Sequence, residues 1–166
     1  MGVANDRSIA WGIARAVAAE GATLAFTYQG EALQKRVKPL ADQVGARHVL
    51  PCDVSDEAQV LRFRDELLAE HGRDHVHLVF ANAGVGGGSS FVKDSREEWE
   101  RTFAIDWWGV YYCARAFLPL LIASGDGVLV NTSSVSGLWA ALGPGIPNTA
   151  YSTAKFAVRG LSLIHI

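Results

Sequence analysis

The chain has 166 residues, of which 49% are hydrophobic and 19% are charged, and it contains 17 glycines. These proportions are typical of a single globular α/β domain with many tight turns. A formal net charge of −2 gives no electrostatic basis for binding nucleic acid or an anionic membrane, and no apolar run approaches the ~20 residues of a membrane span.

The spacing of apolar residues alternates between strand and helix periodicity along the chain. Strands are predicted over 22–28, 48–52, 76–81 and 128–132, and helices over 8–20, 31–44, 55–71, 95–123 and from Tyr151 onward. The opening Ser55–Glu57 and the residue Ser95 are predicted caps, and Pro119 is expected to bend or shorten its helix. Repeated β-α units with nearly continuous apolar strands predict a doubly wound parallel sheet with helices on both faces.

The cysteines and histidines predict neither a disulfide nor a metal site. Cys52 and Cys113 are far apart and have no CxxC spacing, so we expect buried thiols and a reducing cytoplasm. The five histidines include no HExxH arrangement, so no metal is predicted. The N-terminal sequence also lacks the basic-then-apolar pattern of a secretory signal.

The main chemical signal is the pair Tyr151 and Lys155, which lie four residues apart and therefore on one face of a helix. A phenol has a reference pKa near 10. A neighbouring ammonium group favours the phenolate and makes the phenol a usable proton donor. This spacing alone is also common in ordinary amphipathic helices, so its meaning depends on the motifs upstream.

Glycine and polar residues stand where ligands approach a parallel sheet. Gly2 precedes the first helix, where backbone N–H groups can meet a pyrophosphate; the alternative is a glycine turn capped by Ser8. Asp53 ends the second strand, where its carboxylate can accept from an adenine amine or cap the next helix. Asn82–Gly84 ends the third strand and either lets a ligand approach closely or forms a flexible loop.

Four motifs together resemble the short-chain dehydrogenase/reductase family over nearly the whole chain. They are Asp53-Val54, the NAG of Asn82, Ala83 and Gly84, the NTSS of Asn131–Ser134, and the YSTAK that contains Tyr151 and Lys155. The resemblance implies a Rossmann-like three-layer αβα fold. It also implies reversible hydride transfer between NAD or NADP and a carbonyl or secondary alcohol.

The same resemblance implies roles for individual residues. Tyr151 is expected to be the general acid/base and Ser134 to orient the carbonyl group. Lys155 is expected to hold the nicotinamide ribose and to lower the pKa of the tyrosine. The expected cofactor contacts in this part of the chain are Asp53, Val54, Asn82, Ala83, Gly84, Tyr151 and Lys155.

The chain departs from that family at three points. The family's further catalytic asparagine should fall at Ile105-Asp106, and a carboxylate cannot donate a hydrogen bond as an amide does. The gap from Ser134 to Tyr151 is longer than usual, with the stretch Gly143–Asn148 as the insertion. The usual glycine-rich fingerprint is absent.

The first fifty residues resemble a divergent branch of the same superfamily, the bacterial enoyl-acyl-carrier-protein reductases. The similarity lies in GVANDRSIAWGIARAVAAEGATLAFTYQGEALQKRVKPLA. It implies that Gly2, Ser8 and Ile9 contact the pyrophosphate, that Gln29 lies near the adenosine ribose, and that NADH is favoured. The catalytic tyrosine of that branch should fall at Asn148.

Three functional interpretations of the sequence therefore remain open. From about Cys52 onward the chain resembles the main carbonyl-reducing branch, which makes carbonyl reduction the first prediction. Reduction of an enoyl thioester in fatty-acid synthesis is the alternative. An inactive nucleotide-binding fragment is the alternative from another class. The change of branch near residues 50–57 is either an assembly chimera or a natural hybrid.

Both ends of the chain are expected to be cut. A doubly wound sheet needs a central strand before Gly2, and its loss would leave unpaired backbone in the core; Met1 is then an internal methionine. The family's C-terminal substrate lobe is also absent. Leu161–Ile166 is the peptide that a common transposon sequencing adapter encodes, so we predict one NAD(P)-binding domain over 1–160 and a non-native tail over 161–166.

The family resemblance also implies that the full-length parent is a homo-oligomer, assembled through its long helices. An aromatic group on the fourth helix either forms that interface or is buried within one subunit. Its members are Trp107, Trp108, Tyr111 and Tyr112.

Overall fold

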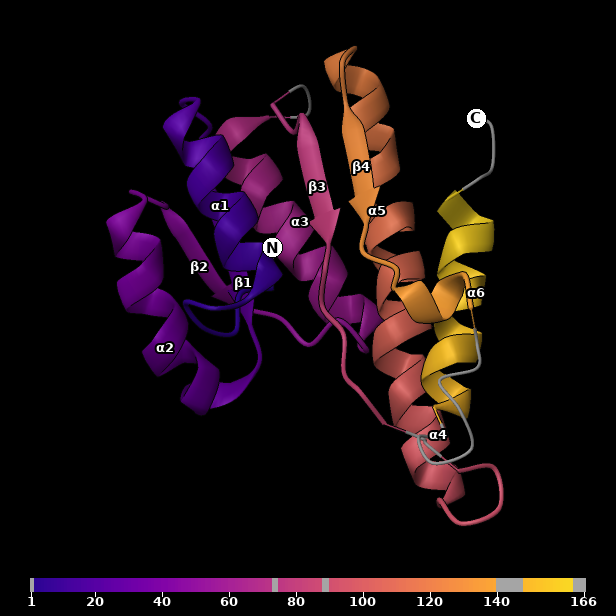
Figure 1. The fold of residues 1–166 in the computed structure, drawn as a ribbon. Helices are drawn as coiled ribbons and strands as arrows, with labels where there is room; N and C mark the ends of the chain where they lie inside the picture. The colour runs from indigo at the N-terminus through magenta and orange to yellow at the C-terminus, as the bar shows by residue number, and fades with distance from the viewer. Residues whose placement is uncertain (1, 73–74, 88–89, 140–147, 163–166) are drawn as a thin grey trace.

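The structure, a computed structural model, describes residues 2–72, 75–87, 90–139 and 148–162, and its helices and strands alternate (Figure 1). The elements are α1 (Ile9–Ala19), β1 (Ala25–Tyr28), α2 (Gly30–Gln43), β2 (His48–Pro51), α3 (Glu57–His71), β3 (Leu78–Ala81), α4 (Arg96–Phe103), the π-helix η1 (Ala104–Trp108), α5 (Gly109–Ser124), β4 (Val128–Asn131), the 3₁₀-helix η2 (Val135–Gly137) and α6 (Thr149–Ser162). Every helix and strand predicted from the sequence is present.

The strands pair in parallel, as predicted, but they form two separate pairs. β1 pairs with β2 and β3 pairs with β4, while Gly2 forms an isolated parallel bridge with Thr27 of β1. An apolar cleft of about 520 Å³ is lined by residues of both β1 and β3. The cleft therefore lies between the two strand pairs.

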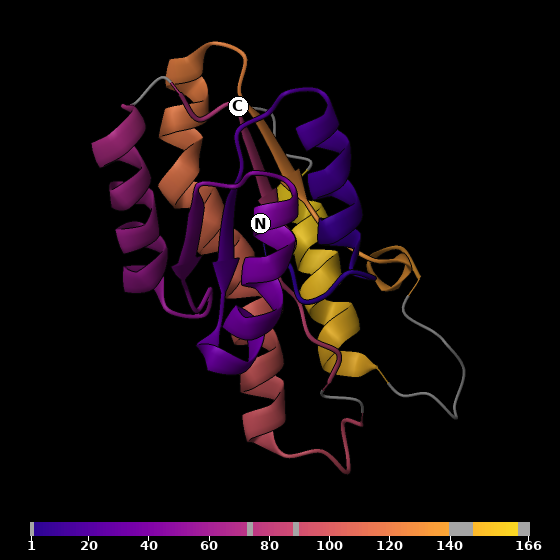
Figure 2. The same ribbon diagram turned by 90° about the vertical axis from the view of Figure 1, so that its left-hand side faces the viewer.

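Helices cover both sides of the strands, which confirms the predicted α/β class. Figure 2 shows α1 on one side and α3 and α5 on the other. A first cluster of buried residues joins α1, α2 and β1 around Phe26 and Val37, and a second joins α3 and α5 around Val60 and Phe117. The two clusters pack the helices against the strands.

The helix expected over 95–123 differs from the prediction in one respect. It contains a π-helical segment, η1, between α4 and α5. Such segments are single-turn insertions that often occur at functional sites. Pro119 lies inside α5, which continues to Ser124, so the predicted shortening does not occur.

The predicted caps are present in detail. The Oγ of Ser95 accepts from the backbone N–H of Glu98 at 3.3 Å. Within the opening Ser55–Glu57, Asp56 is the capping residue and accepts from the N–H of Ala58 at 2.9 Å. These contacts satisfy N–H groups that a helix start leaves without an intrahelical partner.

Several expectations fall partly outside the described residues. α6 includes Leu161 and Ser162 of the predicted tail, whereas 163–166 lie outside the described part, as does Met1. Of the predicted insertion Gly143–Asn148, only Asn148 is described. No helix in the described part has both the length and the apolar composition that crossing a bilayer would require.

Both cysteines are free thiols; Cys52 is buried, as predicted, whereas Cys113 is half-buried. Burial raises the pKa of Cys52 to about 11, and the nearby Cys113 adds to this effect. Burial likewise raises the pKa of Cys113 to about 11. Both groups are therefore protonated and weakly nucleophilic at neutral pH.

Candidate active site

Polar residues that follow β3 and β4 meet at the carboxyl edge of this strand pair. The hydroxyl of Thr132 donates to Oδ1 of Asn82 at 2.8 Å, and the backbone N–H of Thr132 donates to the carbonyl of Ala81 at 3.1 Å. The NAG and NTSS motifs, which are far apart in sequence, are thus joined directly.

Tyr151 and Lys155 lie on α6, one turn apart, as predicted. The ammonium group of Lys155 is 5.5 Å from the centroid of the Tyr151 ring, within the range of a cation–π contact. Lys155 is only 3% exposed, and its Nζ donates to the backbone carbonyl of Thr132 at 3.1 Å. The lysine therefore ties α6 to the end of β4.

Asp106 completes the environment of this lysine. It lies on η1, is 0% exposed, and places Oδ1 3.1 Å from Nζ of Lys155. Its Oδ2 accepts from the backbone N–H of Val85 at 3.3 Å. Burial raises the pKa of the Asp106 carboxyl, although Lys155 and the Val85 N–H act in the opposite direction.

Gly84 packs directly against this buried pair. A Cβ at Gly84 would lie 2.8 Å from Oδ1 of Asp106 and 3.4 Å from Nζ of Lys155, so a side chain there would press on the ion pair. The glycine itself is exposed. Only glycine therefore fits against the ion pair at this position without displacing it.

The two serines after β4 have different partners. The Oγ of Ser134 accepts from the backbone N–H of Ser136 at 3.1 Å and caps η2. The Oγ of Ser133 donates to the carbonyl of Lys155 at 3.1 Å. Because no hydrogen bond joins Ser134 to Tyr151 within the described ranges, the role of Ser134 in orienting a carbonyl stays a prediction.

A second group of predicted residues meets at the carboxyl ends of β1 and β2. The side-chain amide of Gln29 donates to Oδ2 of Asp53 at 2.6 Å. Oδ1 of Asp53 accepts from the N–H and the hydroxyl of Ser55 at 2.9 and 2.6 Å. Val54 touches α5, since a Cβ at Gly109 would lie 2.9 Å from its Cγ2.

The N-terminal loop lies beside both groups. A Cβ at Gly2 would be 3.4 Å from Cβ of Ala83, which brings the loop next to the NAG motif. The Oγ of Ser8 caps α1 by accepting from the N–H of Trp11 at 3.3 Å, so the capping alternative for Ser8 is confirmed. Ile9, the first residue of α1, is 68% exposed, and its backbone N–H faces the start of the helix.

Three contacts in this site could not be predicted from the sequence. The carbonyl of Thr132 acts as an acceptor for Lys155, which residue type does not reveal. A Cβ at Gly137 would lie 2.5 Å from Oγ of Ser133 and 2.7 Å from the carbonyl of Lys155, so η2 can pack against α6 only with glycine there. The contact of Asp106 with Lys155 also requires the fold, although the unusual carboxylate was visible in the sequence.

Comparison with known proteins gives matches over most of the chain. The family described as Enoyl-(Acyl carrier protein) reductase matches residues 2–163. The enoyl-(acyl-carrier-protein) reductase (NADH) 2 of Rhizobium meliloti (strain 1021) is 40% identical over 131 residues, which cover 75% of this chain and 47% of that protein.

Solved structures share the fold. The enoyl-(acyl-carrier-protein) reductase (NADH) of Aquifex aeolicus VF5 superposes with a TM-score of 0.83 at 29% identity, covering 96% of this chain and 67% of that one. A short-chain dehydrogenase/reductase from Burkholderia phymatum in complex with NAD gives a TM-score of 0.77 at 31% identity, covering 92% and 53%. The chain spans about half the length of the curated relative it matches.

Proposed function

Because the chain belongs to the short-chain dehydrogenase/reductase family, and within it to the enoyl-acyl-carrier-protein reductase branch, we propose that it reduces the carbon–carbon double bond of an acyl thioester with NADH. The observation that carries the proposal is the family match over residues 2–163. That match extends well past residues 50–57, where the resemblance of the sequence changes from one branch to the other. It favours the enoyl alternative over carbonyl reduction as the first assignment.

The residues at the strand ends suit a dinucleotide. Gly2 and Ala83 approach each other without large side chains, and the N-terminus of α1 offers backbone N–H groups for a pyrophosphate. The pair Gln29 and Asp53 offers hydrogen-bonding groups for an adenosine. Neither side chain is cationic, so neither can pair with a 2′-phosphate, and NADH is the proposed cofactor.

Reduction needs a hydride and a proton, and the cofactor supplies the hydride when bound. Tyr151 is the proposed proton donor toward the thioester oxygen, because it is half-buried and lies beside the ammonium group of Lys155. Lys155 is held by Asp106 and the Thr132 carbonyl, which leaves its third N–H for the proposed contact with the cofactor ribose. NADH, a proton and the enoyl thioester give NAD⁺ and the saturated thioester.

Carbonyl reduction is the second candidate, favoured by one specific observation. Tyr151 lies one turn before Lys155, whereas the tyrosine of the enoyl branch is expected at position 148, which is Asn148. The acid of the carbonyl-reducing spacing is therefore present. In either case we propose action in the cytoplasm, a small-molecule or acyl-thioester substrate, and a homo-oligomeric parent.

The test is an assay of the purified chain at 340 nm with NADH and with NADPH, using crotonyl and acetoacetyl thioesters and a panel of ketones and alcohols. We expect crotonyl thioester reduction with NADH, lost in Tyr151→Phe while calorimetric NADH binding is kept. Turnover of ketones alone would favour the second candidate. NADH binding without turnover of any substrate would indicate an inactive nucleotide-binding protein, and retained turnover in Tyr151→Phe would remove that residue from the mechanism.

A further inference from the structure

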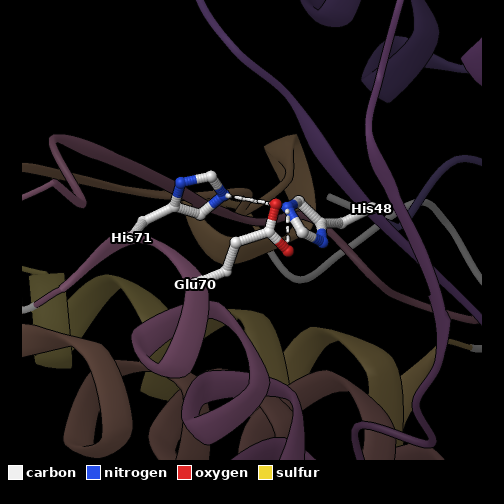
Figure 3. Close-up of side chains that lie close together, drawn as sticks. All are labelled: His48, Glu70 and His71. Carbon is white, nitrogen blue, oxygen red and sulfur yellow. Dashed lines mark hydrogen bonds and ion pairs between the residues drawn. The ribbon is translucent and has the colours of Figure 1, made fainter.

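Three side chains of metal-ligating types meet at the end of the strands opposite to the candidate active site. His48 is the first residue of β2, and Glu70 and His71 are the last two residues of α3. The Nε2 atoms of the two histidines are 2.8 Å apart. The carboxylate oxygens of Glu70 lie 3.6 Å from Nε2 of His48 and 3.9 Å from Nε2 of His71. Figure 3 shows the two rings and the carboxylate facing one another.

We propose that His48, Glu70 and His71 form a binding site for one divalent transition-metal ion of the zinc type. Around a tetrahedral Zn²⁺ with bonds of about 2.0–2.1 Å, neighbouring ligand atoms lie about 3.3–3.4 Å apart. The two nitrogens are closer than this value, at 2.8 Å, and each is slightly farther than it from a different Glu70 oxygen, at 3.6 and 3.9 Å. One ligand atom from each of the three residues lies within 4.8 Å of the other two, so modest side-chain rotations would bring the three around one ion.

The chemistry of the ligand atoms selects the class of metal. Two imidazole nitrogens and one carboxylate oxygen are ligands that zinc and related ions prefer, whereas Mg²⁺ and Ca²⁺ prefer sites made of oxygen alone. In the metal-free pair one Nε2 donates a proton to the other. When the ion is bound, both rings offer a lone pair at Nε2, and the donating ring carries its proton on Nδ1 instead.

The cluster is open to solvent on one side. The side chains of His48, His71 and Glu70 are 12%, 29% and 55% exposed, so the cluster is sheltered on the histidine side and open on the glutamate side. An ion can enter there, and water can fill the fourth position. α3 ends directly after His71, at Gly72, and the negative end of the helix dipole favours a cation.

A bound ion would strengthen the connection between two elements that the His48–His71 hydrogen bond and the His48–Glu70 ion pair already join. It would fix the start of β2 to the end of α3, on the rim of the cleft, which both histidines line. Any ligand that binds the folded chain alone stabilises it by mass action. Zn²⁺ at about 100 times its dissociation constant should raise the melting temperature by about 5–10 °C for a chain of this size.

The experiment is calorimetric titration of ZnCl₂ into the full chain, expressed without a histidine tag and dialysed against a chelator. We expect one site per chain. His48→Ala and His71→Ala should each lose at least about 100-fold in affinity, because even outer partners of metal ligands are worth 10–100-fold. His77→Ala is the control, since His77 directly precedes β3 and its Nε2 lies 3.7 Å from Oδ1 of Asp126; the Zn²⁺ affinity of this variant should match the wild type.

Co²⁺ provides a second measurement that does not depend on any variant. Bound to the wild-type chain it should give the intense visible absorption of a four-coordinate site, and excess Zn²⁺ should remove it. MgCl₂ should produce neither heat nor stabilisation. An absence of Zn²⁺ binding to the wild type, or equal binding by folded His48→Ala and His71→Ala variants, would overturn the proposal.

Discussion

The buried ion pair between Asp106 and Lys155 gives the sharpest prediction about the site. The two charged atoms are 3.1 Å apart, and the residues are 0% and 3% exposed. At an effective dielectric constant of 20 their attraction is about 5 kcal/mol. Desolvation costs several kcal/mol for each ion, and the raised pKa of Asp106 indicates that burial outweighs the attraction for this carboxyl.

Because attraction and desolvation oppose each other, we expect strong energetic coupling between Asp106 and Lys155 but a small net contribution of the pair to the free energy of unfolding. Lys155→Met leaves a buried carboxyl without its cation, and Asp106→Asn leaves a buried ammonium group without its anion. In the wild-type chain the Lys155 Nζ and the Val85 N–H use different oxygens of Asp106, and asparagine replaces one of these oxygens with an NH₂ group that donates and cannot accept. We expect each single variant to lose about 3 kcal/mol and the double variant also about 3 rather than 6.

The assay is urea denaturation at pH 7 of the wild type, both single variants and the double variant. The control is the exposed pair Arg96 and Glu100, whose charged atoms are closer, at 2.6 Å, but whose side chains are 86% and 61% exposed. Its cycle should show no measurable coupling, because solvent screens such pairs. If the effects at Asp106 and Lys155 simply add, the charges do not interact in the folded chain and the reasoning fails.

The same pair predicts a pH dependence. In the folded chain the pKa of Asp106 is raised, so between the unfolded value near 4 and the folded value the folded state binds more protons. The free energy of unfolding contributed by this group is therefore largest below about pH 4 and falls as pH rises through the folded pKa. In Asp106→Asn this contribution should vanish, and an unchanged pH profile would contradict the assigned direction.

Three further predictions concern neighbouring features. Gly84→Ala places a Cβ 2.8 Å from Oδ1 of Asp106, so it should lower the free energy of unfolding by about 1–3 kcal/mol and weaken NADH binding. Gly86→Ala is the control and should do neither, because a Cβ there meets nothing within 4 Å. Cys52 and Cys113 have pKa values of about 11, so at pH 8 they should react with a disulfide reagent far more slowly in the native chain than in urea. Their contribution to the free energy of unfolding should fall as pH rises from about 8.5 toward 11. Fast labelling of the native chain would show that the thiols are accessible. Gln29→Arg should raise NADPH affinity relative to NADH by supplying a cation beside the ribose position, measured by calorimetry, and an unchanged preference would place the ribose elsewhere.

Much of this fold is legible from local sequence patterns. The continuous apolar runs at 48–52, 76–81 and 128–132 each became a parallel strand, and Ser95 capped the helix it was expected to cap. Lys155 was placed beside Tyr151 because helical spacing alone decides that contact. Gln29 and Asp53 met because both follow neighbouring parallel strands, whose carboxyl ends share an edge.

Other contacts depend on the three-dimensional arrangement and could not be predicted from any local sequence pattern. The histidines His48 and His71 are 23 positions apart, and only the packing of α3 beside the start of β2 brings their rings together. The π-helical segment η1 changes the face on which Asp106 lies, and no residue type announces it. The carboxylate at position 106 was visible as a departure from the family, but its partner became clear only from the position of Lys155 under Gly84.

The two candidate reactions, enoyl reduction and carbonyl reduction, differ in where the catalytic tyrosine is expected relative to Lys155. Tyr151 precedes Lys155 by four residues and Asn148 precedes it by seven, so the helical spacing, extended one residue beyond the start of α6, puts both positions on the side that carries the lysine. Asn148 stands just outside α6 and accepts from the N–H of Ser152 at 2.9 Å, so a phenol there would lie about 4.5 Å farther along the axis. In carbonyl reduction the hydride and the proton go to bonded atoms. In enoyl reduction the oxygen is two carbons away from the hydride acceptor, which suits a more distant phenol. Enoyl reduction by this chain therefore requires the thioester oxygen to come one turn closer to Lys155, and the ratio of crotonyl to acetoacetyl turnover measures whether the substrate adopts that position.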